Sequence, residues 1–335
     1  MTHGITETDG LVLTKERAWH GLGTVVEEAP TPREAMELAG MNWQVSFTNG
    51  VGGTTEDGPV YTDTHKLVVR DDNHEVLGCV SKDYQAIQND TLAEFAEALQ
   101  DSNDLVQVES AGTLFGGRRL FYLLKGETFE TISSNDATDP VIPYILLSNS
   151  HDGSLSFSAR PTSIRVVCNN TLEWALGNKS RNIFRLKHTK NLLASVDHAR
   201  KALNLYSKGI PVFKENCEML NKQSMDSLQL VQYFESAYDI LQAGVASKDS
   251  EDVVKKQRAK YQFVEDCEYV FHEEMDLHKF RPTLWTSFNA VSRKIQEGSN
   301  NHYANERQIA NRLFGAANEK TNKIWKATLA QASFN

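Results

Sequence analysis

The sequence lacks any apolar run near the roughly 18 residues that a membrane-spanning helix needs. Its hydrophobic residues make up 40% of the 335 positions and its charged residues 24%, which is typical of a globular protein. The first ten residues are polar and acidic and do not have the pattern of a secretory signal peptide. These absences predict a soluble intracellular protein without a membrane partner.

Cysteine is scarce as well. The four cysteines, Cys79, Cys168, Cys217 and Cys267, lie far apart, and no CxxC pair occurs. This spacing argues against a zinc ribbon and against a redox motif. Isolated cysteines of an intracellular protein are usually small buried hydrophobic residues, and we expect that role for all four.

The common catalytic and nucleotide-binding motifs are also missing. No P-loop, dinucleotide fingerprint, nucleophile elbow or HExxH motif occurs. His272 and His278 are six residues apart and do not share a helical face, so they do not predict a metal site. His151 and Asp152 could form an acid–base or metal pair, but the Gly153 that follows favours a hairpin turn. We therefore expect no metal, no cofactor and no catalytic residue, and a binding protein rather than an enzyme.

Hydrophobic periodicity predicts an α+β fold in which an antiparallel sheet of hairpins packs with helices and a mainly helical C-terminal part follows. The predicted hairpins pair 66–70 with 75–80, 105–109 with 113–124, and 143–148 with 154–167. Helices are predicted after Thr31, from Asn89 to about Leu99, from Asn169 to Leu176, and through most of the chain after Leu192. Residues 49–59, with four glycines, predict a mobile loop. We place a domain boundary near residue 190, giving a mixed domain over 1–190 and a helical region over 191–335.

The charge is uneven along the chain. The net charge is −9, but the window 158–190 holds seven basic residues against Glu173 alone, which makes it +6 and leaves −15 for the remainder. Such asymmetry predicts a polyanionic partner. The alternative is a solvated basic face that pairs with acidic neighbours.

Arginine lies beside aromatic residues in the predicted strand 113–124. Alternate strand residues share a face, so Arg119 and Phe121 point one way, and Arg118 and Tyr122 the other. Basic residues that track phosphates next to rings that stack bases are typical of single-strand binding. The alternative is that Phe121 is a core residue with Arg119 at its edge.

Two further groups of basic residues follow. Arg160 and Arg165 differ by five positions, so they face opposite sides of a strand unless Pro161 interrupts it. If the next basic run is extended, Arg181, Arg185 and Lys187 share one side. That run could line a groove, or it could be a connector whose apolar side covers the sheet.

The chain carries, in this order, the segments Ala18–Gly23, Val68–Arg70 with Leu77–Gly78, Leu147–Gly153, Arg165–Leu172 and Trp285–Val291. These segments resemble the phage/plasmid-like proteins of the domain-of-unknown-function 932 family. The resemblance implies a mobile-element protein of the bacterial cytoplasm, without assigned catalytic residues. The hairpin–hairpin–helix order in mid-chain is also similar in topology to phage single-strand annealing proteins.

These observations predict a protein of phage or plasmid replication or recombination that binds single-stranded DNA and anneals strands. Its expected binding residues are Arg118, Arg119, Tyr122, Arg160, Arg165, Arg181, Arg185 and Lys187. We expect a homo-oligomer, in the cytoplasm of a bacterial host cell. The alternative is a protein-binding inhibitor or decoy of a host defence enzyme, whose acidic surface would contact a host or phage protein.

Overall fold

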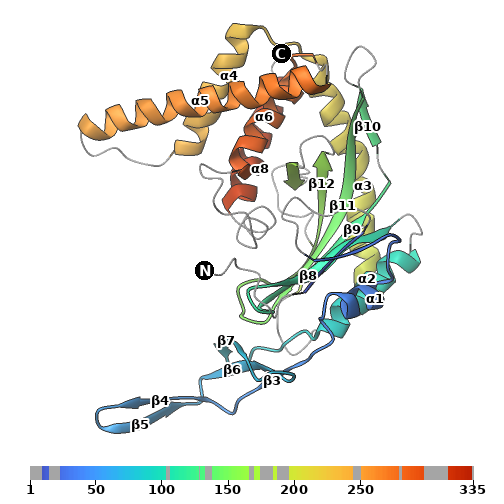
Figure 1. Ribbon diagram of the computed structural model, residues 1–335, viewed down its shortest axis with the longest axis vertical. Helices are drawn as coiled ribbons and strands as arrows, with labels where there is room; N and C mark the ends of the chain where they lie inside the picture. The colour runs from blue at the N-terminus through green and yellow to red at the C-terminus, as the bar shows by residue number, and fades with distance from the viewer. Residues whose placement is uncertain are drawn as a thin grey trace.

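Figure 1 shows the computed structural model of the chain, a curved sheet with helices on one face and further helices beyond one end. It describes residues 10–14, 23–102, 106–127, 129–132, 138–165, 170–173, 184–186, 196–243, 250–278, 281–297 and 316–333. Hairpins of antiparallel strands and a helical C-terminal part confirm the predicted α+β class.

The main sheet has nine strands, with the order β13-β12-β11-β9-β8-β1-β2 along its path; β10 pairs with β11, and β14 with β12. All its pairs are antiparallel except β1 with β2. Its strands are β1 (Leu11–Thr14), β2 (Thr24–Val26), β8 (Gln107–Leu114), β9 (Arg119–Lys125), β10 (Phe129–Ile132), β11 (Thr138–Ser150), β12 (Phe157–Arg165), β13 (Asn170–Glu173) and β14 (Phe184–Leu186).

Two small sheets lie beside the main one. One has the order β3-β6-β7, formed by β3 (Val45–Phe47), β6 (His65–Arg70) and β7 (Val76–Ser81). The other is the hairpin of β4 (Val51–Thr55) and β5 (Gly58–Thr62), which extends away from the body in Figure 1. This hairpin occupies the segment predicted as a mobile loop, so that prediction was wrong. The glycines between residues 50 and 58 are typical of a loop, but the segment also contains Thr and Val residues, which pair across the hairpin.

The helices in the described residues are α1 (Pro32–Leu38), α2 (Asn89–Ser102), α3 (Val196–Lys222), α4 (Ser227–Gln242), α5 (Ser250–His278), α6 (Leu284–Glu297) and α8 (Ala316–Ser333). The predicted start of α1 is confirmed, since Thr31 and Glu34 form a reciprocal capping box. None of the described helices is long and apolar enough to cross a membrane. The helix predicted after Asn169 is wrong, because Asn170–Glu173 pairs with β12 as a strand.

One core cluster joins the sheet to the helices on both sides of residue 190. Leu92 and Leu99 of α2 pack with Leu124 and Leu147 of the sheet, and the same cluster extends to Trp325 of α8. Helix α3 contributes Phe213, Cys217 and Leu220 to this cluster. The boundary at residue 190 stays a prediction, and the structure shows apolar packing that is continuous across it.

Two cysteines follow the expectation and one does not. Cys217 and Cys267 are buried, whereas Cys79 is exposed on β7, an end strand of the β3-β6-β7 sheet. Cys168 lies outside the described residues. Burial raises the pKa of the Cys267 thiol, which keeps it neutral at physiological pH.

A trio of aromatic rings fastens the short strand β14 to the body. The Phe184 ring stacks on Phe95 of α2 at a centroid distance of 5.8 Å, and Phe95 lies edge-on to Phe157 at 5.0 Å. Because β14 has only three residues, its backbone hydrogen bonds to β12 alone give little stability. The ring contacts therefore supply much of the free energy that keeps β14 in the sheet.

We expect Phe184→Ala to lower the free energy of unfolding by about 2 kcal/mol, less than for a fully buried phenylalanine because the ring is half-buried. Urea unfolding followed by tryptophan fluorescence measures the change. Tyr61→Ala is the control, since that ring is 83% exposed and its loss is expected to cost under about 0.5 kcal/mol. Equal midpoints for the two variants would show that Phe184 does not hold β14.

Candidate nucleic-acid interface

The turn between β8 and β9 presents an arginine and an aromatic ring at the end of the main sheet. Phe115, Gly116 and Gly117 all have positive φ angles, of 61°, 69° and 89°. Positive φ is open to glycine but costs energy for a bulky residue such as phenylalanine, so the surrounding structure must hold this turn in place. Arg118 ends the turn with its side chain exposed, and Arg119 begins β9.

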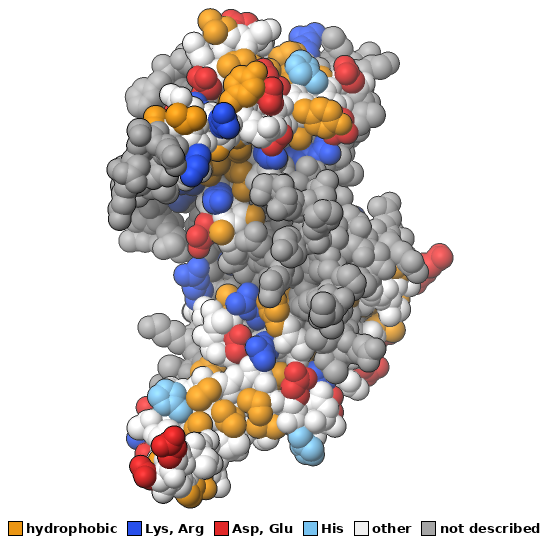
Figure 2. Space-filling model, turned by 60° about the vertical axis from the view of Figure 1, so that its left-hand side comes forward, with side chains coloured by type: hydrophobic (Ala, Val, Ile, Leu, Met, Phe, Trp, Pro, Cys, Tyr) orange, Lys and Arg blue, Asp and Glu red, His pale blue; other side chains and the backbone are white. Residues whose placement is uncertain are grey.

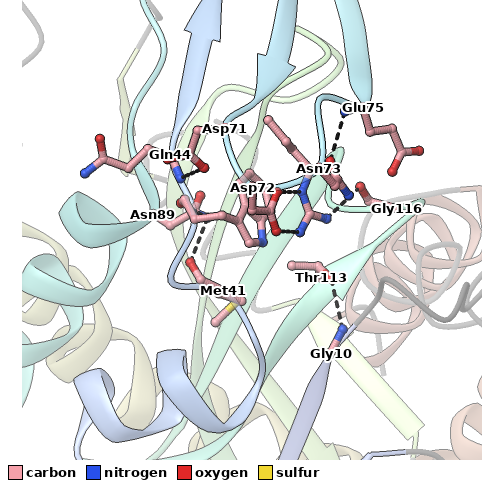
Figure 3. Close-up of polar contacts among 12 residues, drawn as sticks. Gly10, Met41, Gln44, Asp71, Asp72, Asn73, Glu75, Asn89, Thr113 and Gly116 are labelled. Carbon is pink, nitrogen blue, oxygen red and sulfur yellow. Dashed lines mark hydrogen bonds and ion pairs between the residues drawn. The ribbon is translucent and has the colours of Figure 1, made fainter.

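The small sheet forms the support on which this turn rests. The Arg70 guanidinium lies 4.2 Å from the Trp43 ring centroid and forms a bidentate ion pair with Asp72, with Nη2–Oδ2 at 2.6 Å. Its Nη1 donates to the Gly116 carbonyl at 3.5 Å (Figure 3). A Cβ on Gly117 would come within 2.7 Å of the Trp43 ring. Only glycine therefore allows the turn to approach the support this closely.

A second set of buried polar contacts fixes the end of β11 beside the turn. The His151 amide donates to the Arg118 carbonyl at 2.8 Å. The His151 ring is fully buried, 5.4 Å from the Trp43 ring, with Nε2 2.8 Å from Asn89 Oδ1. Asn89 Nδ2 in turn donates to the carbonyls of Met41 and Trp43. His151 is thus part of the support under the turn rather than an accessible acid, base or metal ligand.

Three of the predicted arginines lie on one face of the main sheet. Arg119 pairs with Ser150 of β11, Arg160 of β12 with Leu146, and Arg185 of β14 with Ser158. Directly paired residues share a face, and each strand alternates, so these three positions and Phe121, Leu146 and Ser148 face the same way. We call this the arginine face. On the opposite face, Ala159, Leu147 and Tyr122 pack with α2 and α3 in the main core.

The surroundings of the three arginines differ. Arg185 is exposed, whereas Arg119 and Arg160 are half-buried. Arg119 Nε donates to Ser154 Oγ at 3.0 Å, and its guanidinium carbon lies 5.1 Å from the Phe115 ring centroid. Arg160 and Arg185 are diagonal neighbours on adjacent strands, about 8 Å apart by strand geometry. In Figure 2, basic and acidic side chains both lie in the middle of the molecule.

Tyr122 is not the accessible ring that the sequence predicted. Its ring is fully buried, and its hydroxyl donates to the Pro32 carbonyl at 3.0 Å; burial also raises its pKa. Phe121, on the arginine face, is buried in an apolar cluster with Leu123, Tyr144 and Leu146. Neither ring can meet a base without leaving its cluster, so their stacking role was wrong. The alternative in which Phe121 is a core residue with Arg119 at its edge is the one observed.

The remaining predicted residues are separated or lie outside the description. Arg165 ends β12 opposite Val141, five positions beyond Arg160, so its position belongs to the opposite face. Pro161 does not interrupt the strand: it pairs with Ile145, and it falls between the β12 residues that pair with β14 and those that pair with β13. The missing N–H of proline is tolerated at such a gap. Arg181 and Lys187 lie outside the described residues.

Two residues at the arginine face, Lys125 and Phe115, were not predicted from the sequence. Lys125 follows Arg119 at an even interval on β9 and faces the same way, opposite Tyr144. Phe115 was placed inside a predicted strand over 113–124, although the Gly116-Gly117 pair after it is a turn signal. Counting every second residue from Arg119 identifies Lys125, and the glycine pair identifies the turn that contains Phe115.

The arrangement suits an extended polyanion more than a small substrate. An apolar cluster fills the centre of the face, and the basic residues stand around it. Among the described residues, no group of three or more His, Cys, Asp or Glu side chains could hold a metal ion. The acidic residues Glu75 and Asp152 lie near the turn, toward the small sheet. Leu146, Ser148 and Phe121, which lie between the arginines, are buried, so a polyanion could reach only the margins of this face, away from the two acidic residues.

A family model described as "domain of unknown function (DUF932)" matches residues 76–325, three quarters of the chain. The chain belongs to this family. No curated protein and no solved structure matches the chain. Two segments within the matched residues meet near the β8–β9 turn: His151 bonds to the Arg118 carbonyl, and a Cβ on Gly78 would come within 2.6 Å of the Asp152 Cα. Arg70, which also supports the turn, precedes the matched residues.

The close approach of Gly117 to Trp43 gives one test of this support. We expect Gly117→Ala to lower the free energy of unfolding by about 2–3 kcal/mol, because it adds both left-handed strain and a clash with the indole. Gly40→Ala isolates the strain, since Gly40 has φ +57° and open space around it. Gly53→Ala has neither effect. In urea unfolding, the loss of unfolding free energy should be largest for Gly117→Ala, smaller for Gly40→Ala and smallest for Gly53→Ala. Equal losses for Gly117→Ala and Gly40→Ala would show that the clash with Trp43 does not contribute.

The Arg70–Asp72 pair gives a second test, with a defined pH dependence. The hydrogen bonds from Arg70 lower the pKa of Asp72 in the folded state. Its stabilising contribution is then complete above the unfolded pKa of about 3.9 and is lost as pH falls through the lowered folded pKa.

At neutral pH we expect Asp72→Asn to cost about 1–2 kcal/mol, since it leaves the buried Arg70 without its counter-charge. The difference from the unmodified protein should shrink as the pH falls below about 4 in unfolding experiments. Asp239→Asn removes the solvent-exposed partner of Lys260 and should cost under about 0.5 kcal/mol. A loss at Asp72 that stays constant down to pH 2 would contradict the ion-pair account.

Proposed function

We propose that the arginine face binds single-stranded DNA. The observation that carries this proposal is the convergence of Arg119, Arg160 and Arg185, from three separate strands, on one side of the main sheet. Arginine offers a planar fork of donors that matches phosphate oxygens, and it stays charged at every physiological pH. Arg118 and Lys125 add charge at the two ends of β9. Binding of this kind requires neither a metal nor a cofactor.

Phe115 replaces Tyr122 as the ring expected to contact a base. It is half-buried at the β8–β9 turn, with the Arg119 guanidinium close to its ring. Base stacking on an aromatic ring contributes roughly 1–3 kcal/mol per base and tolerates any sequence. A strand that follows the margin of the face from the turn toward β14 would meet one ring and then a series of cations.

The wider role follows from the family resemblance and is part of the proposal. A phage or plasmid origin, work in the bacterial cytoplasm, and annealing of single strands in replication or recombination fit a binding protein without catalytic motifs. A homo-oligomer would bring two strands together on neighbouring copies. The alternative, an inhibitor or decoy that contacts a host defence enzyme, needs none of the arginines of this face. Substitution of those arginines therefore separates the two functions.

The test is a salt titration of binding to a labelled strand of about 30 nucleotides. Each phosphate contact contributes about 0.7 to the slope of log affinity against log salt for a single strand. The triple variant Arg119→Ala, Arg160→Ala, Arg185→Ala should lower that slope by about 2 and weaken binding at least about tenfold at low salt.

The control triple, Lys208→Ala, Lys214→Ala, Lys320→Ala, removes the same charge from exposed positions on α3 and α8. It should leave the slope within about 0.7 of the original. An equal fall in slope for both triples would mean that net charge, and not this face, governs binding. No binding by the unmodified protein at low salt would remove the proposed function altogether.

A further inference from the structure

Helix α5 carries an exposed apolar and charged stripe that the packing of the chain leaves uncovered. Among the described residues, ten large hydrophobic side chains are exposed, and four of them, Val253, Val254, Tyr261 and Tyr269, lie on α5. Tyr261 is 68% exposed and Tyr269 is 71% exposed. A helix that only covers a core would be expected to keep such rings on its inner side.

The inner side of α5 is already occupied by other residues. Val264, Cys267, Val270 and Phe271 are buried against α4 and α6 in the main core cluster. Ion pairs within the chain join Lys260 of α5 to Asp239, Asp266 to Lys294, and Glu273 to Arg293. Tyr233, Phe234 and Tyr238 of α4 are buried as well, so they are not the outward contact residues of this region. The outward stripe is a separate surface.

The stripe follows helical spacing. Val254, Arg258, Tyr261, Glu265 and Tyr269 succeed one another at intervals of three or four residues, which places them on one side of the helix. All five side chains are exposed. In Figure 2, where the left side of the Figure 1 view comes forward, hydrophobic side chains lie among charged ones over the helices at the top.

Between Val254 and Tyr269, the span of the stripe, the charges of α5 change sign. Lys255, Lys256, Arg258 and Lys260 precede Tyr261, whereas Glu265, Asp266 and Glu268 follow it. Two copies that pair in parallel would set like charges side by side. Two antiparallel copies would set the basic half of each against the acidic half of the other, and their helix dipoles would also oppose.

We propose that α5 binds α5 of a second copy, antiparallel, about a two-fold axis that passes beside Tyr261. The midpoint between Arg258 and Glu265 lies between positions 261 and 262. An axis there brings each Arg258 to the Glu265 of the other copy and the two Tyr261 rings together. Val254 and Tyr269 flank this centre on each side and cover apolar surface. The inference does not depend on DNA binding.

A contact of one helix with one helix over about four turns is smaller than a standard interface, so the dimer should form in the micromolar range. Sedimentation velocity of the full chain from about 1 to 200 µM should show a monomer–dimer equilibrium. Arg258→Glu and Glu265→Arg should each raise the dissociation constant at least tenfold, because each puts like charges together at two places. The double variant Arg258→Glu, Glu265→Arg exchanges the pair and should restore the dimer.

Lys208→Glu is the matched control for Arg258→Glu. It makes the same charge change at an exposed position of α3 and should leave the monomer–dimer equilibrium unchanged. The arginine-face triple variant should also dimerise normally, which keeps this result separate from the DNA titration. A protein that stays monomeric at 200 µM, or a dimer insensitive to both single reversals, would overturn the proposal. Failure of the double variant to restore a dimer, while it remains folded by circular dichroism, would overturn the Arg258–Glu265 pairing.

Cross-linking tests the orientation. In a background of Cys79→Ser and Cys168→Ser, oxidised Tyr261→Cys should give a disulfide-linked dimer, because the axis passes beside this position. Tyr269→Cys should not, since two copies of residue 269 would lie about 22 Å apart along antiparallel helices, too far for a disulfide. Cross-linking of both variants would indicate a parallel pair, and cross-linking of neither would exclude this face.

Discussion

The buried guanidinium of Arg70 is the contact on which the candidate interface depends. It is 4% exposed and has three partners that come from different parts of the chain: the Trp43 ring, the Asp72 carboxylate and the Gly116 carbonyl. A buried charge is costly unless each side of it is satisfied. The small sheet must therefore stay docked against the β8–β9 turn, and the turn must keep its strained left-handed conformation. Arg118 and Arg119 take their positions from that conformation.

Alternation along the strands then divides the main sheet into two faces with different roles. One face packs against α1, α2 and α3 in the core that also includes the C-terminal helices. The other carries a smaller apolar cluster around Phe121 and Leu146, with arginine and lysine at its margins. Because register is fixed by pairing with β11, Arg119 and Arg160 reach the same face although 41 positions separate them. Basic residues that are far apart in the sequence thus lie on one face.

The helical part has its own division between buried and outward surface. Its aromatic residues on α4 pack inward, and two acidic residues of α5, Asp266 and Glu273, form ion pairs with Lys294 and Arg293 of α6. The outward stripe of α5 uses different residues, and its sign change favours a second copy over a random acidic or basic partner. If dimerisation and DNA binding both occur, they use surfaces formed by different elements. Each copy of a dimer would then contribute one arginine face, and the two faces together would hold two strands.

The sequence by itself determined the α+β class, the helix start at Thr31 and the hairpin of β6 and β7, because periodicity and capping act over a few residues. It also located the basic residues and the family. Only the tertiary structure decided which of them converge. Tyr122 and Phe121 are both apolar strand residues beside arginine, and nothing local distinguishes a core ring from a stacking ring. Asn170–Glu173 has a capping signal, yet pairing with β12 makes it a strand, since a free sheet edge outweighs weak helix propensity. Burial and register are properties of contacts between distant segments, and a linear pattern does not contain them.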